Sequence, residues 1–591
     1  MFSRRVHQNI YLICLLLAAF LMPVSVWLLS AVSIAMSANW LLEGDYRRKY
    51  RTFKSSHRAV ILLMLFAMYL LWLLNTADLI GAIGEIKVRL PLLFFPVVLG
   101  SSVRPGPRTL RLVLLSFTAG CIVATVAGIL ALTGVLPVEI SSPRDLALFV
   151  PSIRLSILLC FAIFSSLWLI MADHAGLALH GIEGAEPGGG AASVGEKKTL
   201  TENTVTCSGH AGVSRGREAR TAGTGMTSPG SDLTFTAMVW DILNSRRTTL
   251  SAGLAVAAAA MSWFLFRLLS VTGIILFVIL LVITGIYMIA ACRRFLAGML
   301  LLVAAATMTA AAVILMHSAI HAQHHPANPS LNEPMSTTAS GTDYTHYPEE
   351  TLTENGYLVW INVCEEELRK EWNERSGMDY DGPDAAGNEL RVTLIRYITF
   401  LGMTKDSAAM ATLTDMDISG IEKGFANPLY TRKGSPRARA YELAWELHRA
   451  SSGANPSGHS LTQRPEFYRA AFGIIKEHPW CGVGTGDVAM AFSDEYESNA
   501  TPLTEEYRLR AHNQYLTFAV TFGIPGMIVA VALIMIPWLR CKCRWSYLFL
   551  LFMTVTLVTM FNDDTFSSFT GAAFFSYFYT LLIVTCNRNE T

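Results

Sequence analysis

The sequence RLRAHNQYL at residues 508–516 ends a long polar segment and opens an apolar one. It places His512 at a boundary between membrane and water, with Arg508 and Arg510 beside it. Further upstream, Arg464 starts a short helical pattern in the same polar segment. A neutral imidazole can accept a proton from a hydroxyl group, and arginine forks bind phosphate oxygens in pairs. These residue types at a membrane surface suit an enzyme that acts on a lipid-linked anionic substrate.

Each of these features also has a purely structural explanation. His512 could lie among the lipid headgroups as an interfacial side chain, and Arg464 could cap or pair within the helix that it starts. Arg508 and Arg510 are of the type that anchors to lipid headgroups. The glycine-rich run at 482–486 could form a phosphate nest, but a plain tight turn explains it equally well. The chemical interpretation therefore depends on the elements that must position these residues.

The composition is that of a protein with many membrane spans. The chain of 591 residues is 52% hydrophobic and 15% charged, and its mean hydropathy is +0.40, whereas about a quarter of the residues in soluble domains are charged. Many separate apolar runs reach the length of about 20 residues that crosses a bilayer. A net charge of +1 lacks the excess of basic residues that is typical of nucleic-acid-binding proteins. We expect an all-α polytopic membrane protein.

Basic clusters predict how the chain crosses the membrane, because Lys and Arg concentrate in cytoplasmic loops. Placing every cluster in the cytoplasm gives about twelve transmembrane helices with both termini inside. The predicted layout is spans one to six in residues 1–173, a cytoplasmic low-complexity linker at 174–247, spans seven to nine at 248–317, a large and mostly helical extracytoplasmic domain at 318–510, and spans ten to twelve at 511–591.

Three strings follow one another in the C-terminal part of the chain. The first reads RPEFYR at 464–469 and continues after a helix as HPWCGVGTGD at 478–487. The second is HNQYL at 512–516, followed by GIPG at 523–526, and the third is NDDT at 562–565. In this order they resemble the O-antigen ligase and O-antigen polymerase family, especially its Bacteroidetes-type polymerase-like members.

The resemblance implies a membrane glycosyltransferase of lipopolysaccharide or surface-polysaccharide biosynthesis. Its donor would be a glycan on polyprenyl pyrophosphate, and its acceptor a sugar hydroxyl of another glycan or of the lipid A core. His512 is then expected to be the catalytic base and Arg464 the pyrophosphate clamp. The protein would lie among the lipids of the bacterial inner membrane as part of the cell envelope, with its active site facing the periplasm.

Further arginines near the predicted outer surface are candidates for substrate binding. Arg89 precedes a Leu-Pro pair and Arg154 starts span six, and both oppose the positive-inside bias. The family has an arginine at the outer start of the eighth span, where this chain has Val271. Arg267 lies one helical turn earlier and could supply the missing charge. The predicted substrate-binding residues are Arg89, Arg154, Arg267, Arg508 and Arg510.

No cofactor or metal is expected for the reaction. Asp415 and Asp417 have Asp-x-Asp spacing but lie in a helix-like segment far along the chain from the arginines. The CKC string at 541–543 fits an ordinary turn better than a ligand site. Metal-independent transfer is the simpler interpretation. Cys364 and Cys481 lie in the predicted outer region, where an oxidising compartment would permit a disulfide between them.

Two other classes of function compete with the glycosyltransferase. A transporter or flippase of lipid-linked glycans would line the middle of the membrane with charges, whereas the informative charges of this chain gather at one face. A non-catalytic scaffold for envelope assembly is compatible with the valine at position 271. Ligase and polymerase are not separated by the sequence, because they share donor and chemistry and differ in the acceptor.

Overall fold

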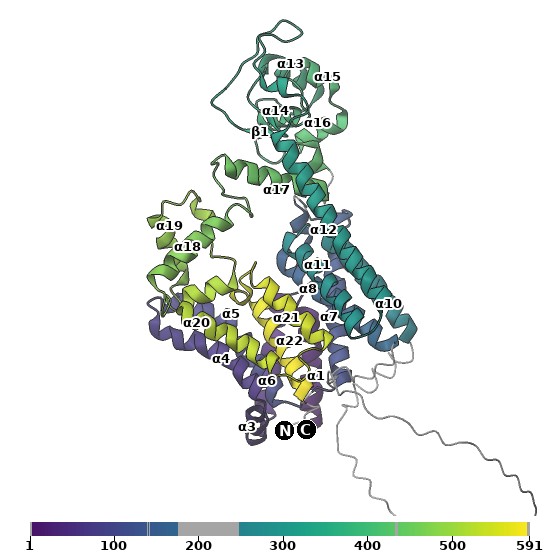
Figure 1. The fold of residues 1–591 in the computed structure, drawn as a ribbon, viewed down its shortest axis with the longest axis vertical. Coiled ribbons are helices and arrows are strands. Elements are labelled where there is room, and N and C mark those ends of the chain that lie inside the picture. The colour runs from purple at the N-terminus through teal and green to yellow at the C-terminus, as the bar shows by residue number, and fades with distance from the viewer. Residues whose placement is uncertain are drawn as a thin grey trace, which may run out of the picture.

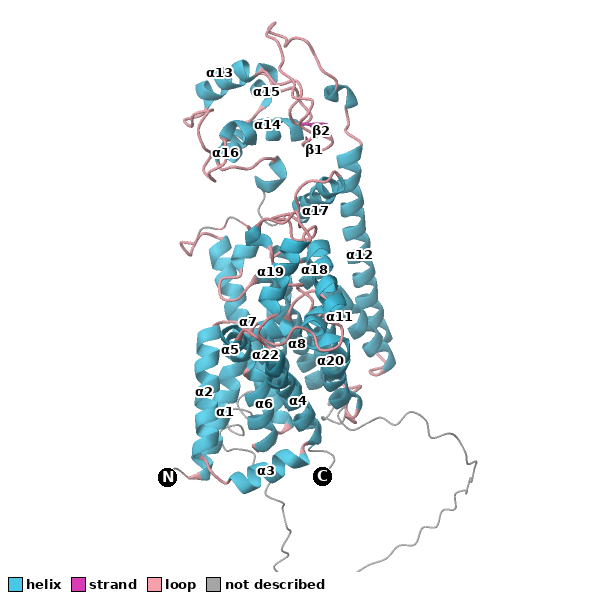
Figure 2. Cartoon of the chain, turned by 90° about the vertical axis from the view of Figure 1, so that its left-hand side faces the viewer, coloured by secondary structure: helices cyan, strands magenta, loops and turns pink. Residues whose placement is uncertain are grey.

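A bundle of long helices carries a smaller helical domain at one end (Figures 1 and 2). The computed structural model describes residues 3–103, 105–138, 140, 142–174, 247–431 and 435–587. Apart from its two end residues, the predicted linker at 174–247 lies outside this part of the chain. The N- and C-terminal ends and α3 (Tyr46–Ser55) lie at the end of the bundle opposite the smaller domain (Figure 1).

Nine helices in the described part of the chain are long and apolar enough to cross a membrane. They are α2 (Val26–Leu42), α4 (His57–Leu71) with η1 (Trp72–Asn75), α7 (Pro107–Leu132), α8 (Ser152–His174), α10 (Arg247–Arg267), α11 (Val271–Ala290), α12 (Phe295–His324), α20 (Gln514–Leu539) and α22 (Phe569–Asn587). The three other predicted spans coincide with α1 (Arg4–Leu21), α6 (Pro91–Ser101) and α21 (Tyr547–Thr559). The helical membrane architecture is confirmed, and the count of twelve spans stays a prediction.

The last helix, α22, forms the centre of the bundle. It is apolar on all sides, as a helix surrounded by other helices must be, and 89% of its membrane-length window is buried. The ring of Phe578 in this helix packs edge-on against the rings of Phe117 and Phe161, and the distances between ring centroids are 5.1 and 4.8 Å. The Tyr577 hydroxyl donates to the carbonyl of Leu15, 2.7 Å away. The C-terminal helix therefore fixes helices from the first third of the chain.

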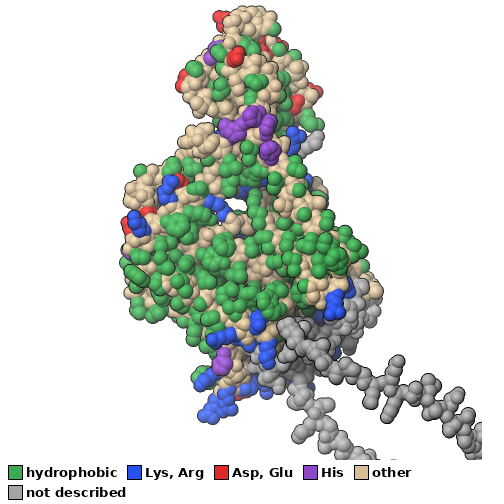
Figure 3. Space-filling view, in the orientation of Figure 1, with side chains coloured by type: hydrophobic (Ala, Val, Ile, Leu, Met, Phe, Trp, Pro, Cys, Tyr) green, Lys and Arg blue, Asp and Glu red, His purple; other side chains and the backbone are tan. Residues whose placement is uncertain are grey.

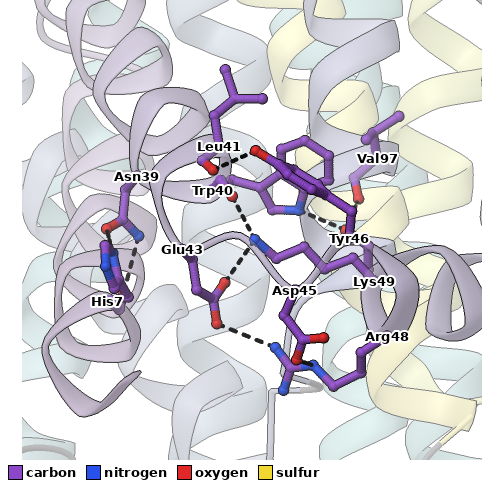
Figure 4. Close-up of polar contacts among 11 residues, drawn as sticks. His7, Asn39, Trp40, Leu41, Glu43, Asp45, Tyr46, Arg48, Lys49 and Val97 are labelled. Atoms are coloured by element: carbon purple, nitrogen blue, oxygen red, sulfur yellow. Dashed lines mark hydrogen bonds and ion pairs between the residues drawn. The ribbon is translucent and has the colours of Figure 1, made fainter. Parts of the chain in front are cut away.

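An ionic network around the buried Lys49 holds the turn between α2 and α3 at the far end of the bundle (Figure 4). Lys49 is 1% exposed and pairs with Glu43 at 2.9 Å, while its ammonium also donates to the carbonyl of Trp40 at 2.5 Å. Arg48 pairs with Glu43 and with Asp45, at 3.2 and 2.9 Å. Each buried charge thus has an ionised partner, which a buried cation requires. The network keeps basic helix α3 folded back against the bundle end.

The smaller domain is built on a continuation of α12, which runs past position 317 to His324 before Pro326. Its core gathers Trp372, Tyr380, Leu394 and Tyr397, all fully buried. The remaining elements of the chain between α12 and α20 are η4 (Pro329–Asn332), β1 (Thr353–Glu354) paired antiparallel with β2 (Tyr357–Leu358), α13 (Glu365–Arg375), α14 (Leu390–Phe400), α15 (Ser407–Thr412), α16 (Asp415–Glu422), η5 (Pro428–Thr431), α17 (Pro436–Ser451), α18 (Arg464–Glu477), α19 (Val488–Ser498) and η6 (Glu505–Tyr507).

The predicted disulfide between Cys364 and Cys481 is wrong. Both thiols are free: Cys364 is buried at the start of α13 in the smaller domain, and Cys481 is exposed in the loop after α18. They belong to different packing units, which the chain sequence alone did not reveal. The disulfide in the described residues joins Cys543 to Cys586.

Candidate functional site

Arg464 is the centre of a polar chain that joins three elements. As the first residue of α18, it donates from its guanidinium to the side-chain oxygen of Asn562 and to the Asn562 carbonyl, the latter at 3.4 Å. The Asn562 amide nitrogen in turn donates to the hydroxyl of Thr272 in the first turn of α11. Asn562 lies in the loop between α21 and α22. The arginine is therefore held at the junction of α18, this loop and α11.

The string around Thr272 is the one in which the expected arginine is replaced by Val271. Ser270 caps α11 by accepting from the amide of Gly273 at 3.3 Å, and its hydroxyl lies 3.0 Å from that of Ser156 on α8. Val271 itself is 39% exposed. The string thus contributes hydroxyl groups to the site, and the cation at this junction comes from Arg464.

His512 lies immediately before α20 in a left-handed backbone conformation, with φ of 47°. This conformation is uncommon for residues other than glycine. The next residue, Asn513, caps α20 by accepting from the amides of Tyr515 and Leu516 at 3.0 and 3.1 Å. The half-buried imidazole stands beside Phe467, one turn after Arg464 on α18, with ring centroids 5.7 Å apart. The turn therefore directs the histidine toward the helix that starts with Arg464.

The start of α20 is also fastened to the loop between α21 and α22. The backbone N–H of Gln514 donates to the carbonyl of Met560 at 2.8 Å. The side-chain oxygen of Gln514 accepts from the backbone N–H of Phe566 at 2.8 Å. The Thr517 hydroxyl donates to the carboxylate of Asp564 at 2.6 Å. These bonds hold the segment that begins with the HNQYL string against the segment that contains the NDDT string.

Asp563 brings a negative charge to the same loop. Its carboxylate lies 3.9 Å from the guanidinium of Arg154 at the start of α8. Burial raises the pKa of Asp563 above its usual range, while the charge of Arg154 opposes the rise. A cavity of about 30 Å³, which is room for one water, lies beside Arg154, Asp563 and the hydroxyl-bearing side chain of Thr559. The structure thus brings Arg154 into the neighbourhood of Arg464 and His512.

Arg89 and Arg510 belong to a different arrangement, in which they share Glu85. Arg510 pairs with Glu85 at 2.6 Å, and Arg89 pairs with the other oxygen of the same carboxylate. Arg89 is 2% exposed, and its guanidinium lies over the ring of Tyr69, 4.4 Å from the centroid. This network ties α5 (Leu79–Arg89) to the chain two residues before His512. Through Arg510, the network holds the backbone near His512 against α5.

The two other predicted arginines lie apart from this arrangement. Arg508 donates to the carbonyl of Leu503 at 3.3 Å within its own loop. The guanidinium of Arg267, at the end of α10, lies 5.7 Å from the centroid of the Trp263 ring. Arg267 precedes the Ser270 cap by three residues, so it stands near the site in sequence.

The glycine run at 482–486 forms a tight packing contact, and the phosphate-nest alternative fails. The amides of Val483 and Gly484 donate to backbone carbonyls of α20 at 2.9 and 3.1 Å, and the amide of Gly486 donates to Thr76 at 3.2 Å. A Cβ at Gly484 would lie 2.2 Å from the carbonyl oxygen of Asn75. The glycines therefore let the loop approach α20 and η1, and their N–H groups are not open to an anion.

The Asp-x-Asp pair also has a structural function. Asp417 completes a capping box with Thr414 at the start of α16, and it accepts a hydrogen bond from the Tyr397 hydroxyl at 2.5 Å. Asp415 is exposed, and its carboxylate lies 3.8 Å from Arg375. The two carboxylates serve a helix terminus in the smaller domain.

Sequence reasoning missed three residues of the site, Thr272, Asn562 and Asp563, as individual contributors. Asn562 and Asp563 stood inside the NDDT string, so their region was recognised without their partners. Thr272 stood inside the string singled out for lacking an arginine. Its hydroxyl alone carries no sequence signal, because threonine is common in apolar helices.

One comparison with known proteins matches part of this site. Residues 437–531 match the family model described as O-antigen ligase. The match includes Arg464 and His512 and ends inside α20, and it confirms the resemblance indicated by the ordered strings. It indicates a glycosyltransferase-type enzyme in a bacterial membrane. No curated protein sequence matches the chain.

Proposed function

With residues 437–531 matching the O-antigen ligase family, we propose that this protein transfers a glycan from polyprenyl pyrophosphate to a sugar hydroxyl. The acceptor is the end of another lipid-linked glycan or the lipid A core. The reaction takes place at the periplasmic face of the inner membrane and needs no metal ion. Arg464 and His512 carry the chemistry, and Arg154 assists them.

In this reaction the acceptor oxygen forms a bond to the anomeric carbon of the donor sugar, and the bond from that carbon to the pyrophosphate breaks. The acceptor proton passes to the imidazole of His512, which acts as general base. The electron pair of the broken bond stays on the pyrophosphate, where negative charge grows. Arg464, held at the junction by Asn562, stabilises that charge with its remaining N–H groups.

The observation that carries the proposal is the placement of Arg464 and His512 at the start of α18, beside the loop at 562–564. Two fixed contacts define it: the hydrogen bond from Arg464 to Asn562 and the packing of His512 on Phe467, one helical turn further. Arg154 adds a second cation across Asp563. A base and two arginines at the level of a helix start suit an anionic leaving group whose lipid tail stays in the membrane.

The test is transfer by the purified, full-length protein in detergent. The donor is a glycan on polyprenyl pyrophosphate, the acceptor is either a second lipid-linked glycan or lipid A core, and EDTA is present throughout. We expect release of polyprenyl pyrophosphate in step with a lengthened or newly lipid-A-linked glycan, and the productive acceptor distinguishes polymerase from ligase. Movement of intact donor across proteoliposome membranes without glycosidic transfer would contradict the proposal and favour a transporter.

A further inference from the structure

Histidine side chains gather at the junction between the helix bundle and the smaller domain (Figure 3). The last two turns of α12 carry His317, His321 and His324, and His325 follows as the C-cap. The rings of His321 and His325 lie 4.6 Å apart between centroids. The ring of His324 lies 4.9 Å from that of His448 on α17. The junction therefore contains five of the chain's 14 histidines.

The His324–His448 pair connects two elements that are far apart in sequence. His448 is half-buried, and its Nδ1 atom is buried without a hydrogen-bond partner. A buried polar atom without a partner is costly and calls for an explanation. His321 and His324 are exposed, so their side chains can reorient.

We propose that this junction binds a divalent transition-metal ion such as Zn²⁺ through His324, His448 and His321. Imidazole nitrogen is a preferred ligand for Zn²⁺. His321 and His324 are neighbours three residues apart on one helix, and His448 approaches from α17. The third imidazole would come from His321, whose exposed side chain lies one helical turn before His324.

The ion would satisfy the orphaned nitrogen of His448 and join α12 to α17. Helices α12 and α17 pack against each other, and residues 452–463 separate α17 from Arg464. The metal is thus structural and takes no part in the transfer step. The binding site itself does not depend on the proposed glycosyltransferase function, and its test uses metal binding as the readout.

The experiment measures Zn²⁺ binding to chelator-treated, full-length protein that carries no polyhistidine tag. Thiol reductant is omitted, so that the Cys543–Cys586 disulfide stays intact. Titration calorimetry gives affinity and stoichiometry, and the apparent unfolding midpoint is recorded with and without Zn²⁺. We expect one Zn²⁺ per chain and a midpoint raised by Zn²⁺, because an ion that binds the native state stabilises it.

The variants His324→Gln, His448→Gln and His321→Gln should each weaken Zn²⁺ binding by about tenfold or more, because each removes one of three metal bonds. They should also lose the Zn²⁺-dependent rise in midpoint. His57→Gln, an exposed histidine at the opposite end of the bundle, should bind as wild type does. Unchanged Zn²⁺ affinity in the His324 and His448 variants, or no binding by wild type, would overturn the proposal. So would variants whose midpoints drop equally with and without Zn²⁺.

Discussion

The family resemblance implies two arginines at the pyrophosphate site, one of them near position 271. In this chain Arg464 is the arginine at that junction. The arginine expected near Val271 is absent, yet the same string reaches the site through Thr272 and Asn562. Arg464 thus occupies the junction where two helices and the loop at 562–564 meet. Arg154 supplies the second cation from α8, held by Asp563. The positive charge of the site is therefore retained with a different distribution over the helices.

Replacing Arg464 by lysine should lower the transfer rate by about a hundredfold, which corresponds to about 3 kcal/mol of lost transition-state stabilisation. An ammonium keeps the charge but cannot bond Asn562 and a phosphate oxygen through one planar fork. The measurement is the initial rate at saturating donor. Arg469→Lys is the matched control, because Arg469 is exposed on the same helix and pairs with Glu466. Similar rates in both variants would remove Arg464 from the mechanism.

The pair of Arg154 and Asp563 makes a prediction about pH and stability. A carboxyl whose pKa is raised by folding favours the native state at low pH, and this contribution is lost as pH rises through the folded pKa. Arg154 opposes the rise in the pKa of Asp563. Arg154→Gln should therefore raise that pKa further and make the apparent unfolding midpoint fall more steeply with pH than in wild type.

Thermal scans across a pH series measure this effect. The double variant Arg154→Gln, Asp563→Asn should lose the added pH dependence, because no carboxyl remains to ionise at that position. A steeper pH dependence that persists in the double variant would show that another group causes it.

At the scale of elements, the glycine loop at 482–486 packs closely between η1 and α20. Gly484 has φ of 99°, and a Cβ there would lie 2.2 Å from the Asn75 carbonyl oxygen. We expect Gly484→Ala to destabilise the protein by about 1–3 kcal/mol, since the backbone strain adds to the contact. Gly253→Ala in α10 is the control, because its Cβ would meet nothing within 4 Å. Equal apparent unfolding midpoints for the two variants would contradict this function of the loop.

The apolar runs were sufficient to predict most helices, because a helix that crosses a membrane needs a long apolar segment that the sequence shows directly. The ninth span was predicted to end at 317, whereas α12 ends at His324, because the hydrogen bonding of a helix can continue beyond its apolar segment. The separate helix α5 was not predicted, since its residues are too few and too mixed to stand out.

Within the site, the sequence indicated Arg464 and His512 but not how they are held. The partner of Arg464 lies 98 residues away, and the next bond spans 290 residues. Such pairs arise from tertiary packing and leave no local pattern. For the same reason the glycine run allowed both a phosphate nest and a turn until its N–H partners were known.

At the scale of the whole molecule, basic clusters gathered at one end predict the orientation of the chain in the membrane. Side chains of Lys and Arg surround the end that carries α3 (Figure 3). An impermeant thiol reagent added from outside should label Ser340→Cys and spare His210→Cys. The background carries Cys481→Ser, because Cys481 is exposed in the predicted outer region. The reverse labelling pattern would place His512 in the cytoplasm and exclude a periplasmic active site.

The measurement that tests the central claim most directly is glycan transfer by His512→Ala in EDTA. Loss of a positioned base costs about 10²–10⁴-fold in rate, so turnover should fall by that factor while the protein still binds the lipid-linked donor. His478→Ala serves as control, because His478 is exposed at the other end of α18, and it should transfer at the wild-type rate. Near-normal turnover by His512→Ala would contradict the proposed mechanism.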